Sequence, residues 1–244
     1  MRRLFPDPAE LDDDAMAGAY RLPAGRHLRV NFVTALDGAI SVDGRSGGLG
    51  SPGDRRVFRV LRALADAVLV GAGTAAAEGY RPITPDSAVG LIRSRLGRPA
   101  VAPVVVVSRR ASLAPDDQLA TDAVTPTLLV TCAAADPGRR AALTEAGVEV
   151  LVCGEDDVDL PVALDALADR GLAQLLCEGG PALFRAALAA DVVDELDLSI
   201  APLLVGGGPG MVPRALPLPA RAELTQVLTE DDVLFIRYQL PRRR

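Results

Sequence analysis

An apolar run that ends in a carboxylate and two glycines has the clearest chemical content in this chain. Residues 175–177 are the apolar run, and Glu178, Gly179, Gly180 and Pro181 follow them. Apolar residues then recur at helical spacing, so the pattern predicts a strand, a tight turn and a helix. The first N–H groups of a helix have no partner within it, and glycine lets a ligand approach the backbone, so such a junction can bind phosphate. A structural turn with an exposed glutamate is the alternative, and this stretch alone does not decide between the two.

Two other expected strands also end in residues that suit a ligand. Residues 67–70 are apolar and run into Gly-Ala-Gly-Thr at 71–74, which on its own is also common in plain turns. Residues 103–107 are a β-branched run that ends in Ser-Arg-Arg at 108–110. A hydroxyl and two arginines at the carboxyl end of a strand suit the 2′-phosphate that distinguishes NADP from NAD, and a solvated loop is the equally open alternative.

Missing residue types narrow the chemistry further. The chain has no lysine, which excludes Schiff-base enzymes, pyridoxal enzymes and a Walker-type phosphate lysine. Its single histidine, His27, disfavours zinc clusters and histidine-dependent nucleophiles, and we expect it at the surface. Carboxylates, amides, arginines or a bound cofactor would have to supply any catalysis. Scattered positions predict buried thiols in a reducing compartment for Cys132, Cys153 and Cys177.

Composition sets the class of protein. A chain of 244 residues that is 49% hydrophobic and 24% charged is expected to be globular, with a substantial core. The formal charge of −6 argues against a nucleic-acid surface. No apolar run approaches the roughly 18 residues of a membrane span, and aspartates occupy positions 12–14, where a signal peptide would be apolar. We therefore expect a cytoplasmic protein without a membrane partner.

The elements that position these residues begin near residue 28. Residues 1–27 contain prolines and an aspartate run without periodicity, which predicts an extended N-terminal arm. Residues 28–35 alternate as a strand does, and Asp37 follows them before a glycine-rich loop at 41–50. Asp37 is either an Asx turn or a site residue, and the position alone favours the turn.

A helix is expected to begin at Ser51. Its hydroxyl suits the N-cap, a proline follows, and Asp54 stands three residues on. Arg55, Arg59 and Arg62 share one face, which is expected to be solvated unless an anionic substrate lies at the sheet edge. The expected buried side chains are Val57, Phe58, Leu61 and Leu64.

The second half alternates strands with helices and closes with a hairpin. Expected strands are residues 127–131, 148–152 and 193–201, expected helices are residues 137–146 and 160–170, and the hairpin is residues 222–228 with 233–240. This alternation predicts an α/β fold with a mostly parallel central sheet flanked by helices and a C-terminal antiparallel hairpin. No linker divides residues 28–244, which we expect to form a single domain.

Four stretches together resemble one family. They are residues 31–38 (Asn-Phe-Val-Thr-Ala-Leu-Asp-Gly), 68–74 (Val-Leu-Val-Gly-Ala-Gly-Thr), 178–183 (Glu-Gly-Gly-Pro-Ala-Leu) and 193–207, which runs from Val-Asp-Glu-Leu to Ile-Ala-Pro-Leu-Leu-Val-Gly-Gly. In this order they resemble the reductase domain of the bifunctional riboflavin-biosynthesis protein, which has a dihydrofolate-reductase-like fold. The resemblance covers roughly residues 28–240, and the deaminase half of that protein has no counterpart in the sequence.

The resemblance implies an NADPH-dependent reduction, in which hydride opens the ribose of an aminopyrimidine phosphoribosyl compound to a ribityl chain. It also implies a homodimer. In this family pattern the nicotinamide half of the cofactor lies along Val70, Gly71 and Thr74, the 2′-phosphate on Ser108 and Arg109, and the diphosphate on Gly179, Gly180, Pro181, Ala182 and Leu183. Asn31, Asp37 and Glu178 would surround the hydride acceptor, and Ser51 and Arg62 would face the ribose phosphate. Glu178 could donate a proton or hold the sugar hydroxyls as the ring opens.

Two positions depart from the family pattern, both on the substrate side. Ala39 stands where the family often has a lysine, and Glu78-Gly79-Tyr80 stands where it tends to have Asp-Asn-Pro or Asp-Asp-Pro. Since Tyr80 could stack on a heterocycle, a reductase of another pyrimidine or a pterin is one alternative. A non-catalytic protein that binds NADPH is the other.

Overall fold

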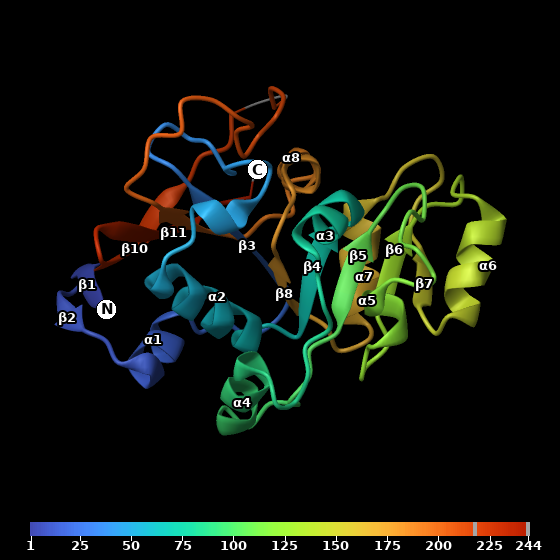
Figure 1. Ribbon diagram of the computed structural model, residues 1–244, viewed down its shortest axis with the longest axis horizontal. Coiled ribbons are helices and arrows are strands. Elements are labelled where there is room, and N and C mark those ends of the chain that lie inside the picture. Colours follow the sequence, from blue (N-terminus) through green and yellow to red (C-terminus); the bar gives the residue numbers. More distant parts are fainter. Residues whose placement is uncertain (217–218, 243–244) are drawn as a thin grey trace.

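A single twisted sheet organises the computed structural model, which describes residues 1–216 and 219–242 (Figure 1). Its eleven strands lie in the order β2-β1-β10-β11-β9-β3-β8-β4-β5-β6-β7. The strands are β1 (Arg2–Phe5), β2 (Ala9–Glu10), β3 (His27–Thr34), β4 (Ala67–Gly71), β5 (Val104–Val107), β6 (Leu128–Thr131), β7 (Glu149–Val152), β8 (Gln174–Cys177), β9 (Glu195–Ile200), β10 (Glu223–Glu230) and β11 (Val233–Gln239). From β9 to β7 all neighbours are parallel, whereas β2, β1, β10 and β11 pair antiparallel at the other end. The predicted mostly parallel sheet with a C-terminal antiparallel hairpin is therefore confirmed.

Helices cover both faces of the parallel part. They are α1 (Asp13–Ala19), α2 (Pro52–Leu64), α3 (Ala72–Glu78), α4 (Ala88–Arg95), α5 (Gln118–Thr121), α6 (Pro137–Glu145), α7 (Leu160–Ala168) and α8 (Pro181–Ala189), with a short 3₁₀ helix, η1 (Ser46–Gly48). Side chains of α7 and α8 pack on one face, and those of α2 to α6 pack on the other. Strands buried on both faces need continuous apolar runs, as in the four valines of β5.

The expected extended N-terminal arm is wrong. β1 pairs with β10, and α1 packs on α2 with Met16, Ala17 and Tyr20 buried, so residues 1–27 extend the sheet and cover part of its core (Figure 1). His27 is also not at the surface, since it is 7% exposed and begins β3. Its Nε2 lies 3.5 Å from the buried carboxylate of Glu195, which gives the imidazole a polar neighbour inside the protein.

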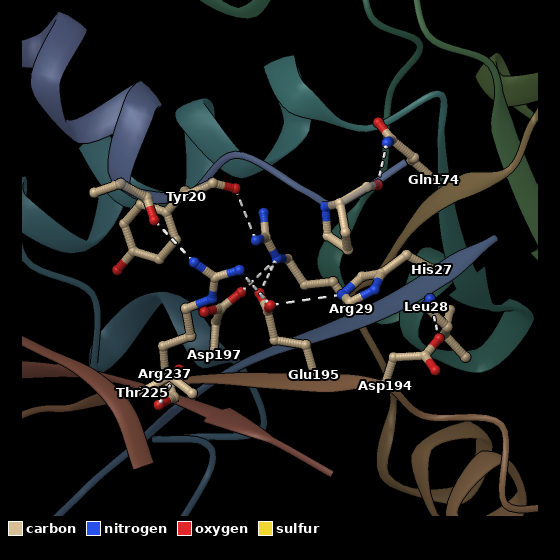
Figure 2. A network of polar contacts seen from close by, with 12 residues as sticks. Tyr20, His27, Leu28, Arg29, Gln174, Asp194, Glu195, Asp197, Thr225 and Arg237 are labelled. Carbon is tan, nitrogen blue, oxygen red and sulfur yellow. Dashed lines mark hydrogen bonds and ion pairs between the residues drawn. The ribbon is translucent and has the colours of Figure 1, made fainter. Parts of the chain in front are cut away.

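A buried ionic cluster joins α1 to the sheet (Figure 2). Arg29 on β3 pairs with Glu195 on β9 and lies 2.8 Å from Asp197, while Arg237 on β11 donates to Glu195 at 2.5 Å. The two guanidiniums also donate to backbone carbonyls at the end of α1, with distances of 2.8 Å in both cases. Buried charges are tolerated only when they are paired and hydrogen-bonded, and here the pairing fixes the N-terminal segment to the sheet.

An unpredicted helix supports α2. Residues 88–95, in a loop bracketed by prolines, form α4 behind the N-cap Ser87. From α4 the buried Arg93 donates to the carbonyl of Ala65 at 2.5 Å, which is the C-cap of α2, and to that of Pro99 at 2.6 Å. The guanidinium thereby satisfies carbonyl groups that the end of α2 leaves without helical partners.

Candidate active site

A pocket of about 640 Å³ opens at the carboxyl ends of β3, β8 and β4. Val30 on β3 and Leu69 on β4 both stand beside Cys177 of β8, so the residues that follow them meet at one level of the sheet. The volume is in the range of small-molecule and cofactor sites. The predicted site residues that line this pocket are Asn31, Arg62, Thr74, Glu78, Tyr80, Glu178, Gly180 and Pro181.

Glu178 is the most strongly held side chain of the pocket. It is 8% exposed, and Arg62 donates to its two carboxylate oxygens from Nε at 2.6 Å and from Nη2 at 2.7 Å. The Tyr80 hydroxyl donates to Oε2 at 2.6 Å. Charge-assisted bidentate pairing of this kind fixes a carboxylate in position.

Glu178 shifts the pKa values of both donors, Arg62 and Tyr80. Burial lowers the pKa of Arg62, but the charge and hydrogen bonds of Glu178 more than offset this effect and leave that pKa above its ordinary value. Burial, and next the charge of Glu178, raises the pKa of Tyr80, so the hydroxyl stays protonated. Arg62 also lies 4.3 Å from the ring centroid of Phe58. The arginine face of α2 is thus not uniformly solvated, since Arg62 serves the pocket.

The turn between β8 and α8 can accept only glycine. Gly179 has φ +86°, and a Cβ there would lie 3.0 Å from the Phe32 ring. A Cβ on Gly180 would lie 2.2 Å from Thr74 Oγ1. Gly71 N donates to Gly179 O at 2.8 Å, so the two predicted glycine turns lie directly against each other.

The N-terminus of α8 is open to a ligand. Side chains cap the N-termini of α1, α2, α4, α5, α6 and α7, whereas α3 and α8, which begin after Gly71 and Gly180, have no side-chain cap. The N–H groups of the first turn therefore remain for an anion, and their positive helix end favours one. A diphosphate fits this environment, whose donors are backbone groups and whose glycines permit close approach.

The other predicted cofactor residues lie along the neighbouring strand ends. Val70 is fully buried, so only its backbone is available, and Gly71 follows it at the start of α3. Ser108 lies just after β5 and is 7% exposed, and its hydroxyl accepts a hydrogen bond from Ser112 N at 2.9 Å. Arg109 is exposed beside it. Ser108 thus shapes a turn, while Arg109 is free to reach a ligand at this edge.

Asn31 and Asp37, both expected around the hydride acceptor, have separate environments. Asn31 lines the pocket and donates to Asp197 O at 3.3 Å. Asp37 is exposed outside the pocket lining, and its carboxylate accepts from Val205 N at 2.9 Å and Gly206 N at 2.6 Å. The hydrogen bond from Gly206 is the main cause of the lowered pKa of Asp37. Asp37 Oδ1 also accepts from Ala39 N at 3.3 Å, which is the local turn that its position favoured.

Ser51 and Glu78 also make internal contacts. Ser51 is the N-cap of α2 and accepts from Asp54 N at 3.0 Å, as the sequence predicts. It is not among the residues that line the pocket. Glu78 lines the pocket, and its Oε1 accepts from Ser46 N at 2.8 Å.

Asp54 is a pocket residue that the sequence presented only as part of a helix start. It lines the pocket from the first turn of α2. Burial raises the pKa of Asp54, although a hydrogen bond with Ser199 and the charge of Arg55 act in the opposite direction. A carboxyl group with a raised pKa in a pocket is suited to exchange protons. Only the sheet, which brings Ser199 of β9 to the start of α2, reveals this environment.

Residues 1–216 and 219–242 contain neither a membrane-spanning helix nor a cluster of metal ligands. No helix in these ranges is long and apolar enough to cross a membrane. In the same ranges, no group of three or more histidine, cysteine, aspartate or glutamate side chains could hold a metal ion.

Comparison with known proteins gives one family for most of the chain. Residues 26–234 match the RibD C-terminal domain. The 2,5-diamino-6-ribosylamino-4(3H)-pyrimidinone 5′-phosphate reductase of Archaeoglobus fulgidus is 29% identical over 182 residues, which cover 74% of this chain and 82% of that protein. The reductase of the same name from Methanothermobacter thermautotrophicus is 33% identical over 183 residues, covering 74% and 80%. The crystal structure of a pyrimidine reductase-like protein from Corynebacterium diphtheriae matches with a TM-score of 0.79 and 28% identity over 89% of this chain and 93% of that one. The chain belongs to the RibD C-terminal domain family.

Proposed function

We propose that this protein is an oxidoreductase of riboflavin biosynthesis, which uses NADPH to reduce a phosphorylated ribosylaminopyrimidine. Two kinds of observation support the proposal. Relatives that align over 74% of the chain are named as reductases of such a compound, and the pocket is large enough for a small substrate beside a cofactor end.

The observation that carries the proposal is the lack of room for a side chain at Gly180, where an added Cβ would lie 2.2 Å from Thr74 Oγ1. A side chain at position 180 would force Thr74 to shift, and Gly180 leaves the first N–H groups of α8 without a side-chain cap next to the pocket. A dinucleotide diphosphate would lie on these groups, with the nicotinamide end directed along Gly71 and Thr74 toward Glu178. A bound reduced nicotinamide supplies the hydride.

The protein's own residues would orient the substrate and manage a proton. As the ribose ring opens, its ring oxygen needs a proton, and Asp54, whose pKa is raised by burial, is suited to provide it. Both carboxylate oxygens of Glu178 already accept hydrogen bonds from Arg62 and Tyr80. Glu178 would instead accept hydrogen bonds from the sugar hydroxyls. Asn31 would fix the orientation of the substrate from β3.

Arginines other than Arg62 would provide most of the phosphate recognition. Arg62 is engaged by Glu178, whereas Arg55 and Arg81 also line the pocket and have no carboxylate within ion-pair distance among the described residues. A phosphate needs cations whose donors are not already occupied. We therefore expect Arg55→Ala to raise the KM for the substrate more than the KM for the cofactor.

Preference for NADPH over NADH would come from the end of β5. Arg109 is exposed there beside Ser108 and can reach a 2′-phosphate. The test is the ratio of NADPH to NADH affinity in Arg109→Ala and Ser108→Ala. An unchanged ratio in both variants would remove this strand end from the cofactor site.

A homodimer is part of the proposal. On the antiparallel part of the sheet, Phe5, Leu224 and Leu234 project from the face turned away from α2 and are 41%, 44% and 37% exposed. Apolar side chains gathered on one exposed sheet face are typical of an interface. A second copy of the chain would cover them.

The central experiment measures NADPH oxidation with the phosphoribosyl aminopyrimidine as substrate. We expect turnover that depends on this compound, and tight NADPH binding in its absence. Turnover of a dihydropterin but not of the phosphoribosyl compound would identify a pterin as the substrate instead. Tight binding with no substrate-dependent oxidation would leave a non-catalytic NADPH-binding protein, and no binding at all would refute the proposal.

A further inference from the structure

The segment Glu78-Gly79-Tyr80 connects two walls of the pocket. Glu78 is the last residue of α3, and Gly79, with φ +66°, ends the helix in the left-handed conformation. The side chains on either side of this glycine bind different parts of the chain. Glu78 reaches Ser46, and Tyr80 reaches Glu178.

The wall held by Glu78 is the glycine-rich loop at residues 41–50. Ser41, Gly44, Ser46, Gly47 and Gly50 all line the pocket from this loop. Its internal order comes from paired hydrogen bonds between residues 42 and 45 and from the 3₁₀ helix η1. Leu49 anchors the end of the loop, since it is 3% exposed and packs with Ala35, Ala39 and Ala201. The glycines around Arg45 lose much conformational freedom when they are ordered, so this part of the loop needs a restraint of its own.

Glu78 provides that restraint. Its Oε1 accepts from Ser46 N at 2.8 Å. Within residues 1–216 and 219–242, this is the only hydrogen bond that joins residues 41–50 to another part of the chain. The acceptor oxygen of Glu78 takes up the N–H of Ser46 in the middle of the loop, so this hydrogen bond restrains where the loop lies.

The wall held by Tyr80 is the buried ion pair. The Tyr80 hydroxyl donates to Glu178 Oε2 at 2.6 Å, and Arg62 Cζ lies 5.4 Å from the centroid of the tyrosine ring. The ring also packs against the apolar residues under β4 and α4. Since its hydroxyl and part of its ring are already engaged within the protein, Tyr80 is placed to fix Glu178.

We propose that Glu78 and Tyr80 are positioning residues that together brace the pocket. Glu78 holds the loop at 41–50 as a wall on the substrate side, and Tyr80 holds the Glu178 carboxylate in its orientation. Glu78 and Tyr80 act through the loop and the Glu178 carboxylate, and it is the loop and Glu178 that contact the substrate. This inference rests on the proposed function for its kinetic consequences, but its structural part can be tested without substrate or cofactor.

Limited trypsin digestion reports the loop directly. The chain has no lysine, and Arg45 is the one arginine in the loop, so the trypsin site there is the Arg45–Ser46 bond. The N–H group of this peptide bond, that of Ser46, donates the hydrogen bond to Glu78. In Glu78→Ala we expect cleavage after Arg45 to be about tenfold faster, because the bond to the carboxylate is lost. Glu78→Gln keeps an acceptor oxygen and should be cleaved at close to the wild-type rate.

The matched control is Glu145→Ala, which removes an exposed glutamate at the end of α6, away from the pocket. Cleavage after Arg45 should not change in it. Mass spectrometry of the fragments separates this bond from the other arginine sites.

Kinetics tests the positioning role. Glu78→Ala should raise the KM for the pyrimidine substrate about tenfold with little change in the KM for NADPH, and Glu78→Gln should restore the substrate KM. Tyr80→Phe should lower kcat about tenfold and leave cleavage after Arg45 unchanged, because its contact is with Glu178.

Each outcome decides the inference. Unchanged cleavage after Arg45 in Glu78→Ala overturns the brace, whatever the activity. An equal rise of the KM for the substrate in Glu78→Gln and Glu78→Ala also overturns the brace, since it would show that the substrate itself needs the carboxylate charge. Fast cleavage in Glu78→Ala, slow cleavage in Glu78→Gln and no turnover by the wild-type protein would support the brace and refute the proposed function.

Discussion

Replacing Arg29 by methionine tests how much the buried ionic cluster contributes to stability. Arg29 is 1% exposed and pairs with Glu195 and Asp197, which are 0% and 2% exposed. In Arg29→Met, the buried Glu195 carboxylate would keep Arg237 but lose Arg29, and the Tyr20 carbonyl would lose its donor. Asp197 would lose Arg29 as well, although burial raises the pKa of its carboxyl group to about 8. Removing one partner from a buried ion pair costs about 3–5 kcal/mol of the free energy of unfolding.

The assay is urea denaturation, and the control is a pair on the surface. Arg170 and Glu149 lie 2.8 Å apart with side chains 40% and 48% exposed, so Arg170→Met should cost at most about 1 kcal/mol. For a chain of this size, the Arg29→Met cost corresponds to a fall in Tm of about 6–20 °C. Similar losses in the two variants would refute the reasoning that burial makes the cluster important.

The pH dependence provides a second check. Burial alone would raise the pKa of Glu195, but the hydrogen bond with His27 and the charges of Arg29 and Arg237 lower it to about 2. A depressed carboxyl pKa stabilises the protein above the unfolded value and loses that effect as the pH falls through the folded value. The stability difference between wild type and Arg29→Met should therefore narrow as the pH falls from 4.5 toward 2. A constant difference would contradict the assignment of this pKa shift to Arg29.

Four further predictions concern the pocket, α2 and the sheet face. Gly180→Ala should weaken NADPH binding about tenfold in a fluorescence titration, because the added Cβ would lie 2.2 Å from Thr74 Oγ1; an unchanged Kd would contradict the cofactor position. Burial raises the pKa of Asp54. If the Asp54 carboxyl group donates the proton, kcat/KM should fall as the pH rises through this raised pKa. Asp54→Asn should remove this limb of the profile, and a limb that persists would exclude the role. Arg93→Met should cost about 2–3 kcal/mol in urea denaturation, since buried carbonyls of α2 lose their donor, and a loss under 0.5 kcal/mol would show that water replaces it. If the chain forms the proposed dimer through this sheet face, the wild type should sediment as a dimer and Leu234→Glu as a monomer without a change in fold; a dimeric Leu234→Glu would place the interface elsewhere.

Local signals account for what the sequence predicted well. Ser51 followed by a proline marks a helix start because both residues act on the first turn alone, and α2 begins where they predict. The glycines at 179 and 180 likewise predict a tight turn after an apolar run, and the structure has β8, the turn and α8 in that order. The predicted strands match to within one or two residues at most ends.

Long-range contacts account for what the sequence could not give. The N-terminal segment has no periodicity that predicts packing, yet Arg29 and Arg237 bind the end of α1 from two strands of the sheet. Arg62 looked like one of a solvated row, but Glu178, 116 residues away, determines its role. Asp54 similarly acquires its environment from Ser199 on β9. Each of these side chains depends on a neighbour that only the folded sheet supplies.

The place of β8 between β3 and β4 has a consequence for the growing polypeptide. β3 and β4 are complete by residue 71, but the strand that joins them is not made until residue 177. Until then, each of the two apolar strands has an edge without its native partner, and such edges are prone to pair with other chains. The central sheet can therefore form completely only late in synthesis, when about three quarters of the chain has left the ribosome's active centre. A chaperone that shields these strand edges would act before that point.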